Sequence, residues 1–476
     1  MSARQGLNFK LLLKNTIVAF SAQGISLFVS AIMSLVVPKI LGLASYGYWQ
    51  LFVFYASYSG FFHFGLNDGI YLIEGGNERT EINKRKIAGL LQFEIIQQLV
   101  VAGVISVFAC AIAPDCDRFF VIAAFAIYTV ICNLSGLIGY LFQAMNETKL
   151  FSFSTMVDRL SFLFFLLICV YFRIEDFKIY VTCYIFARMC CLAYCCYNAR
   201  EFIVSVRPSF RESLITALFN MKVGCSLMFA NIADILILGV ARALVDSAWG
   251  IEVFGKVSFS LSLVNFFIAF VSQAAMVLFP ALRQGSDAER RRFYRTARNA
   301  IELVFPCIYL LYFPIVWVLG KWLPQFTDSY IYFAILLPVC VFDTKMNICC
   351  ATFFKVLREE RVLLWVNLAT VAGSAFLALI GVYFYHSLAA VLIGAVICII
   401  ARSIWCENHL NKRLEAPSTL LPAEEAIITA LFIFLTLYAG KMEAIFAYTC
   451  IYLLYLVINR NSLVELMHAL HYTFRN

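Results

Sequence analysis

The charged residues inside long apolar segments carry the most distinctive chemistry of this sequence. Five cations lie within such segments, namely Arg159, Arg188, Lys222, Lys256 and Lys345. A charge in the middle of a bilayer costs several kcal/mol, about 2.5–3.5 by the lower estimates, so it must face protein or water. If these cations share one cavity, they form a positive chamber suited to an anionic ligand such as phosphate or pyrophosphate. All five are therefore candidate substrate-binding residues.

Internal ion pairs are the alternative explanation for the same cations. Arg188 is the clearest binding candidate, because no acidic residue is near it in the sequence. The other cations have acids available to them, and the pairings that the sequence suggests are Asp158–Arg159, Asp343–Lys345, and Asp234 with Lys256 or Lys222.

Three acidic residues are candidates for coupling or gating. Asp234 is central in the apolar segment 215–241, where a carboxylate can relay protons or bind a coupling cation. Its alternative role is that of a counter-ion. Asp68 and Glu94 lie near the predicted inner ends of the segments 48–72 and 87–111. Water can reach both there, so we expect gating contacts with cations of the inner loops.

We expect no metal, cofactor or disulfide framework. Nearly all of the 17 cysteines lie inside apolar segments, where cysteine behaves as a small buried apolar residue. The stretch Gly250–Val257 resembles a phosphate-binding loop, but Val257 replaces the hydroxyl residue that would ligate magnesium. We exclude nucleotide binding on that ground.

The composition requires a membrane around these residues. The chain is 62% hydrophobic and 14% charged, against about 25% charged in ordinary soluble domains, and its mean hydropathy is +0.84. Continuous apolar runs of about 20 residues predict membrane-spanning helices rather than barrel strands. We predict about 14 spans in an all-α integral membrane fold, at 15–37, 48–72, 87–111, 119–142, 152–172, 178–198, 215–241, 250–280, 300–319, 330–353, 362–383, 387–406, 424–440 and 444–459.

The basic residues predict the orientation of these spans. With the N-terminus inside, the inner segments carry 25 lysines and arginines and the outer loops carry 7. This asymmetry indicates cytoplasmic N- and C-termini. The most basic loop, 283–298, carries six arginines. It is explained by topology or by binding to anionic headgroups or a partner enzyme.

The two halves of the sequence also share a short pattern near their beginnings. An aromatic residue followed by glycine opens the next long span at Tyr46-Gly47 and again at Trp249-Gly250, an offset of about 203 residues. Transporters built from repeats bind cargo between them. We therefore predict a six-helix lobe at 1–200, a second at 201–410, and two further helices with a cytoplasmic tail at 411–476. No predicted outer loop exceeds about ten residues, which favours a transporter over an enzyme.

Four short stretches resemble the polysaccharide-transporter family, the Wzx-like flippases of lipid-linked oligosaccharides. They are Lys14-Asn15-Thr16 with Gln23-Gly24 and Leu41–Gly47, then Phe64–Gly69, Ala233–Gly239 and Leu278–Arg283. The family often has a basic residue after the aspartate in the third stretch, and this chain has Ile235. An Asp–Arg pair at this point is therefore not carried over from the resemblance.

The resemblance implies the fold of the multidrug/oligosaccharidyl-lipid/polysaccharide exporters, with two six-helix lobes around a central cavity. It implies a cargo of undecaprenyl-pyrophosphate oligosaccharide, flipped to the outer leaflet of the bacterial inner membrane for O-antigen or capsule synthesis. Enzymes of the same pathway, glycosyltransferases or a polymerase, are the expected partners, and nucleic acid is not. A multidrug exporter of organic cations and a membrane glycan polymerase or ligase are the alternatives. The exporter predicts more acids than bases in the cavity, and the enzyme predicts a long outer loop.

Overall fold

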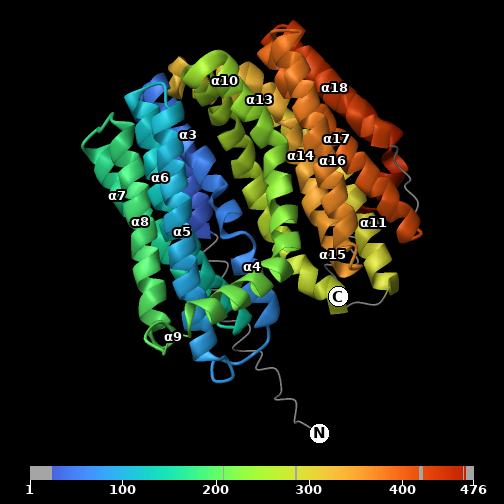
Figure 1. Ribbon diagram of the computed structural model, residues 1–476. Helices are drawn as coiled ribbons and strands as arrows, with labels where there is room; N and C mark the ends of the chain where they lie inside the picture. Colours follow the sequence, from blue (N-terminus) through green and yellow to red (C-terminus); the bar gives the residue numbers. More distant parts are fainter. Residues whose placement is uncertain (1–23, 207, 285–286, 417–421, 465, 468–476) are drawn as a thin grey trace. The chain divides into compact units, whose positions relative to one another are not determined.

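The computed structural model describes residues 24–206, 208–284, 287–416, 422–464 and 466–467, and the regular elements in these ranges are all helical (Figure 1). Ten helices in the described part are long and apolar enough to cross a membrane. Helical residues occur in every one of the fourteen predicted spans. The prediction of an all-α, multi-pass membrane fold is confirmed. Helices form because lipid offers the backbone no hydrogen-bond partner.

The chain divides into two compact units, Met1–Ile232 and Ala233–Asn476. In unit 1, α7 packs along α8 and α5 packs along α6. The helices of unit 1 are one over Gly24–Ile40 that ends in α2 (Val37–Ile40), then α3 (Leu43–Ser57), η1 (Ser59–His63), α4 (Leu66–Ile73), α5 (Lys84–Ile112), α6 (Cys116–Ala144), α7 (Thr148–Tyr171), α8 (Phe177–Asn198), α9 (Arg200–Ile203) and the first part of α10 (Phe210–Gln284).

Unit 2 begins inside α10 and contains the rest of the chain. In this unit α16 and α17 run side by side, and α18 packs on α19 (Figure 1). Its further helices are α11 (Asp287–Val304), η2 (Phe305–Cys307), α12 (Ile308–Trp322), η3 (Pro324–Phe326), α13 (Ser329–Leu336), α14 (Pro338–Lys345), the π-helical η4 (Met346–Ala351), α15 (Thr352–Val356), α16 (Glu360–Tyr383), α17 (Leu388–Arg413), α18 (Pro422–Tyr438) and α19 (Lys441–Ile458).

Several helix starts follow directly from the local sequence. The side chains of Asn83, Asp115 and Asp176 each accept a backbone N–H of the first turn, at the starts of α5, α6 and α8. Such caps satisfy donors that would otherwise lack a partner. Inside α10, Gly250 has a φ of 79°, which kinks the helix into two spans at the predicted boundary. Glycine takes this conformation without the steric cost of a Cβ.

The predicted span 48–72 is a broken helix rather than a continuous one. After α3 the chain tightens into η1, and Phe64 and Gly65 adopt left-handed conformations before α4 begins. Close packing explains the glycines here. A Cβ on Gly65, Gly69 or Gly224 would collide with backbone atoms across the contact between α4 and α10.

The predicted basic loop 283–298 is largely helical. The last described residue of α10 is Gln284, and α11 begins at Asp287. Within α11, Tyr294 and Ile301 are buried in the core of unit 2, whereas Arg291 and Arg292 are exposed. The cause is an apolar stripe at helical spacing, which the density of arginines obscures in the sequence.

We predict that Gly224→Ala destabilises the protein by about 1–3 kcal/mol, because the added methyl group meets the backbone of α4. The matched control is Gly103→Ala in α5, where nothing lies within 4 Å of the new Cβ. Thermal unfolding in detergent measures both. Equal midpoints for the two variants would contradict the close contact.

Candidate cargo and coupling sites

Arg188 and Asp158 form an ion pair between adjacent helices of unit 1. Nη1 of Arg188 in α8 lies 3.3 Å from Oδ2 of Asp158 in α7. The sequence suggests that Asp158 pairs with Arg159 and that Arg188 has no acid nearby, and this interpretation is wrong. Consecutive residues of a helix point in different directions, so the neighbouring helix supplies the partner.

Arg159 belongs to the same group of charges. It interacts with Tyr184 of α8 and with Asp158, and its Nε is buried with no hydrogen-bond partner among the described residues. Two guanidinium groups therefore lie near one carboxylate, and within the described chain only Arg188 forms an ion pair with it. This part of α7 and α8 carries one net positive charge inside the predicted membrane region.

Lys222 is exposed on α10 and makes no ion pair or hydrogen bond with the described part of the chain. It lies twelve residues into α10, about 18 Å along the helix at 1.5 Å per residue. The suggested pairing with Asp234 is wrong, because that carboxylate is bound elsewhere. Lys222 thus remains an uncompensated cation within a predicted span.

Lys256 and Lys345 are both neutralised within unit 2. Lys256 donates to Asp328 over 2.6 Å, and the Asp328 side chain is 70% exposed. The ammonium of Lys345 is buried, and carboxylates from three other helices surround it: Glu302 of α11 at 3.4 Å, Glu407 of α17 at 2.9 Å and Glu425 of α18 at 2.5 Å. The suggested Asp343–Lys345 pair is wrong.

The group around Lys345 also contains Arg298. That guanidinium bonds Asn411, Asn299 and the carbonyl of Ala416, and its Nε lies 3.9 Å from Glu407. An ammonium has three N–H donors, and Lys345 directs them at three carboxylates. It keeps no donor for a cargo, so this cluster ties helices together. The sequence hides it because Arg298 falls in a predicted loop and Glu407 and Glu425 at the ends of predicted spans.

Asp234, a candidate for coupling, is held by an arginine that the sequence does not single out. Arg402 of α17 is 4% exposed and donates from Nη1 to Asp234 over 2.5 Å and to Asn367 over 3.4 Å, and from Nη2 to Asp343 over 2.6 Å. A guanidinium thus occupies the space between two carboxylates and an amide oxygen. Arg402 escapes notice because it lies near the predicted inner end of its span.

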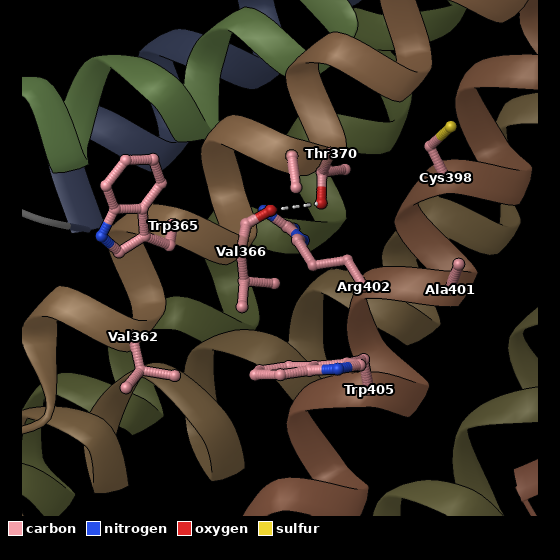
Figure 2. A pocket seen from close by; sticks show the side chains of 9 residues that line it. Val362, Trp365, Val366, Thr370, Cys398, Ala401, Arg402 and Trp405 are labelled. Carbon is pink, nitrogen blue, oxygen red and sulfur yellow. Dashed lines mark hydrogen bonds between the residues drawn. The ribbon is translucent and has the colours of Figure 1, made fainter.

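A cavity of about 580 Å³ opens beside Arg402, between α16 and α17. Figure 2 shows the indoles of Trp365 and Trp405 and the side chain of Arg402 around it. The hydroxyl of Thr370 donates to the carbonyl of Val366 over 2.8 Å. The lining is mostly apolar, so the cavity suits a hydrocarbon chain better than a polar group.

Asp68, a gating candidate, lies just after the break in unit 1. It is 2% exposed and stands in the first turn of α4, where helix N–H groups favour a negative charge. Nδ1 of His63 accepts the N–H of Gly65 over 3.0 Å, so the neutral ring carries its proton on Nε2. That Nε2 lies 3.7 Å from Oδ2 of Asp68. Among the described residues, Asp68 makes no contact with a cation of the predicted inner loops.

Glu94, the other gating candidate, belongs to a buried amide network rather than to a charged one. Its Oε1 accepts from Gln98 over 2.9 Å, and Oε2 has no hydrogen-bond partner in the described part of the chain. Gln98 also donates to the carbonyl of Phe62 over 2.9 Å and accepts from Asn133 over 3.1 Å. Glu94 is fully buried, so the expected access from the inner loops is wrong for this structure.

Charges outside the predicted spans of unit 1 form a separate group. Arg79 bonds both oxygens of Glu147 and one of Glu201, and Lys84 bonds the other oxygen of Glu201. Hydrogen bonds from Lys84 and Arg79 lower the pKa of Glu201, and the hydrogen bond to Glu147 raises the pKa of Arg79. These pairs fasten α9 to the connection between α4 and α5 and leave no free charge for a ligand.

Comparisons with known proteins reveal the fold. No protein-family model and no curated protein sequence matches the chain. The lipid II flippase MurJ in an inward closed conformation matches over 95% of this chain and 100% of its own, with a TM-score of 0.65 and 9% identity. An inward-facing multidrug-resistance MATE transporter of the MOP superfamily matches over 84% of this chain and 98% of its own, with a TM-score of 0.61 and 14% identity.

A third solved structure with this fold is described by the polarity of its own binding pocket. It is a MOP superfamily transporter from Pyrococcus furiosus whose binding pocket is described as having reversed polarity, and it matches over 84% of this chain and 94% of its own. Its TM-score is 0.52 at 12% identity. At these identities the likeness shows the fold alone. The chain has the fold of the MOP superfamily transporters.

We predict that Arg402→Ala lowers the free energy of unfolding by about 3 kcal/mol, because the largely buried Asp343 loses its cation, whereas Asp234 is 55% exposed and adds little. Lys256→Ala is the matched control, since Asp328 is exposed and that pair is worth about 0–1 kcal/mol. Thermal unfolding in detergent compares them. An Arg402→Ala variant as stable as Lys256→Ala would show that the guanidinium is dispensable.

Proposed function

We propose that this protein is a flippase that moves an undecaprenyl-pyrophosphate-linked oligosaccharide from the inner to the outer leaflet by alternating access. The cargo serves O-antigen, capsule or exopolysaccharide synthesis in the bacterial cytoplasmic membrane, with both termini of the chain in the cytoplasm. The glycosyltransferases or polymerase of the same pathway are the proposed partners. The protein carries the lipid and makes no covalent bond, so it is not an enzyme.

The observation that carries the proposal is the unneutralised positive charge in the predicted membrane region of unit 1. Asp158 is the only acid beside two arginines and pairs with Arg188, so Arg159 has no ion pair in the described chain, and Lys222 has no partner there either. Such charges are too costly to face lipid. A pyrophosphate is the anionic group that every polyprenyl-linked cargo shares. Guanidinium groups bind phosphate oxygens in pairs, and an ammonium adds a point charge.

The extent of the structural matches also supports a lipid cargo. The lipid II flippase aligns with 95% of this chain, and the MATE transporter aligns with 84%. A larger part of the chain therefore has a counterpart in the flippase.

The charge distribution opposes the two alternatives. An exporter of organic cations needs acids that its cargo can reach. Asp234 and Asp343 are bound to Arg402, and Glu302, Glu407 and Glu425 surround Lys345. Asp68 and Glu94 of unit 1 are buried. A glycan polymerase or ligase needs a sizeable extramembrane part for its chemistry. The connections α7–α8, α16–α17 and α18–α19 are each only a few residues long.

We predict that Lys222→Ala weakens binding of undecaprenyl pyrophosphate to the purified protein about tenfold, equivalent to about 1.4 kcal/mol. Export of surface polysaccharide by a complemented deletion strain should fall with it. Lys178→Ala is the matched control, because that lysine pairs with Asp117 outside the site. Unchanged binding and export in Lys222→Ala at normal protein level would refute the site.

A second prediction separates binding from folding at Arg188. Arg188→Ala leaves Asp158 without its partner and should lower both stability and export. Arg188→Ala combined with Asp158→Ala removes both charges, so it should regain most of the stability but not the export. Arg188→Lys should retain part of the export, because the positive charge stays but the guanidinium that binds two phosphate oxygens at once is lost. Full export by the double variant would make the pair a structural feature only.

A further inference from the structure

The buried acids of the described chain differ in which group, if any, neutralises or stabilises their negative charge. Glu74 pairs with Lys86 at 2.6 Å, and Glu302, Glu407 and Glu425 each contact Lys345. Asp68 has His63 and the start of α4. Glu94 is fully buried and forms no ion pair within the described residues. An isolated carboxylate buried in a low-dielectric interior is strongly disfavoured, so this group holds a proton instead.

The hydrogen bonds around Glu94 also favour a protonated carboxyl. Both N–H groups of the Gln98 amide are engaged, one with Glu94 and the other with the carbonyl of Phe62. Both N–H groups of Asn133 are engaged as well, with Gln98 and the carbonyl of Ser59. Neither of these two amides has a donor left to solvate a second carboxylate oxygen.

The unsatisfied buried side-chain atoms of α4 and α5 in the described chain are oxygens, which need protons rather than supply them. They are Asn67 Oδ1, Asp68 Oδ1, Gln92 Oε1, Glu94 Oε2 and Gln97 Oε1. Gln97 is three residues after Glu94, and residues at that spacing lie on one face of a helix. A protonated Glu94 can donate to such an oxygen, whereas an ionised Glu94 only adds another acceptor.

In the described chain, no positively charged neighbour neutralises Glu94 in place of a proton. The elements η1, α6 and α9 pack against α5, and the start of α10 reaches it where Ser213 lies against Gly89. None of their titratable residues bonds Glu94 in the described chain. Beyond the first turn of α6, and within the unit 1 part of α10, they are His63, Tyr128, Cys132, Tyr140, Arg200, Glu201, Arg211, Glu212, Lys222 and Cys225. In unit 2, Arg402 already occupies the space between Asp234 and Asp343, so an exchangeable cation has no place there.

We propose that Glu94 binds and releases the proton to which cargo movement is coupled, an inference that rests on the proposed flippase function. The network connects this carboxyl to the break in the helix. Gln97 and Gln98 both donate to the carbonyl of Phe62, two residues before the left-handed Phe64–Gly65. Release of the proton makes the carboxyl a stronger acceptor for one N–H of Gln98, while the other N–H of the same amide is bonded to that carbonyl. The broken helix therefore changes its hydrogen bonding with the protonation state of Glu94.

Infrared difference spectroscopy on the full chain in lipid nanodiscs tests the protonation directly. Wild type should show the carbonyl stretch of a protonated carboxyl that disappears at alkaline pH, and Glu94→Gln should lack it. Glu74→Gln, which neutralises a lysine-paired acid, should keep it. Replacing sodium with a large organic cation should leave the band unchanged. A band that persists in Glu94→Gln but vanishes in Glu425→Gln, or one that sodium abolishes, would overturn the proposal.

Export measurements test the coupling and separate it from the function itself. Glu94→Gln keeps the shape and the acceptor oxygen for Gln98, so it should fold yet export at least tenfold less surface polysaccharide. Glu94→Asp, which can still titrate, should retain part of the export. Loss of export in Lys222→Ala with normal export in Glu94→Gln would overturn the coupling role alone. If neither variant changes export while the infrared band belongs to Glu94, the flippase function fails and its coupling fails with it.

Discussion

The cost of a bare charge in hydrocarbon governs how this chain is built. Each ionisable group in a span must be paired, hydrated or neutral. Unit 2 satisfies this requirement internally, with Arg402 between two aspartates and Lys345 among three glutamates. The described part of unit 1 leaves two positive charges without acids, and it leaves the carboxyls of Asp68 and Glu94 without a cation. The first arrangement holds helices together, and the second leaves chemistry for a ligand and a proton.

Close packing in unit 1 places Glu94 beside the break in the helix, where backbone hydrogen bonds can change. Gly65 and Gly69 let α4 approach α10 near Gly224, and the break before α4 exposes carbonyls that α5 must satisfy. Gln97 and Gln98 do so at Phe62, beside Glu94. A change at one carboxyl is thus transmitted to the backbone through direct hydrogen bonds. Irregular backbone at membrane depth is tolerated only where protein or water satisfies it.

The sequence predicts the fold well and the partners of its charges poorly. Long apolar runs and the basic asymmetry identify the spans because they depend on composition over some twenty residues. The pairing of Asp158 with Arg188 depends on which faces of α7 and α8 meet, and this is not local information. Arg402 and Glu425 were missed for a related reason: a charge near the end of a predicted span looks solvent-accessible until tertiary packing buries it. The helix break was missed because Phe64-Gly65 interrupts a run that is mostly apolar on both sides.

The cluster around Lys345 constrains how the protein is made. Lys345 lies in α14, but two of its three counter-charges, on α17 and α18, are synthesised 62 and 80 residues later. If α14 enters the bilayer first, the charge of Lys345 is only partly neutralised until α17 and α18 have been inserted. Membrane integration of the C-terminal half is therefore not a sequence of independent insertions. Its polar helices must be retained together, at the translocon or against each other, and α18 is the element whose arrival completes the assembly.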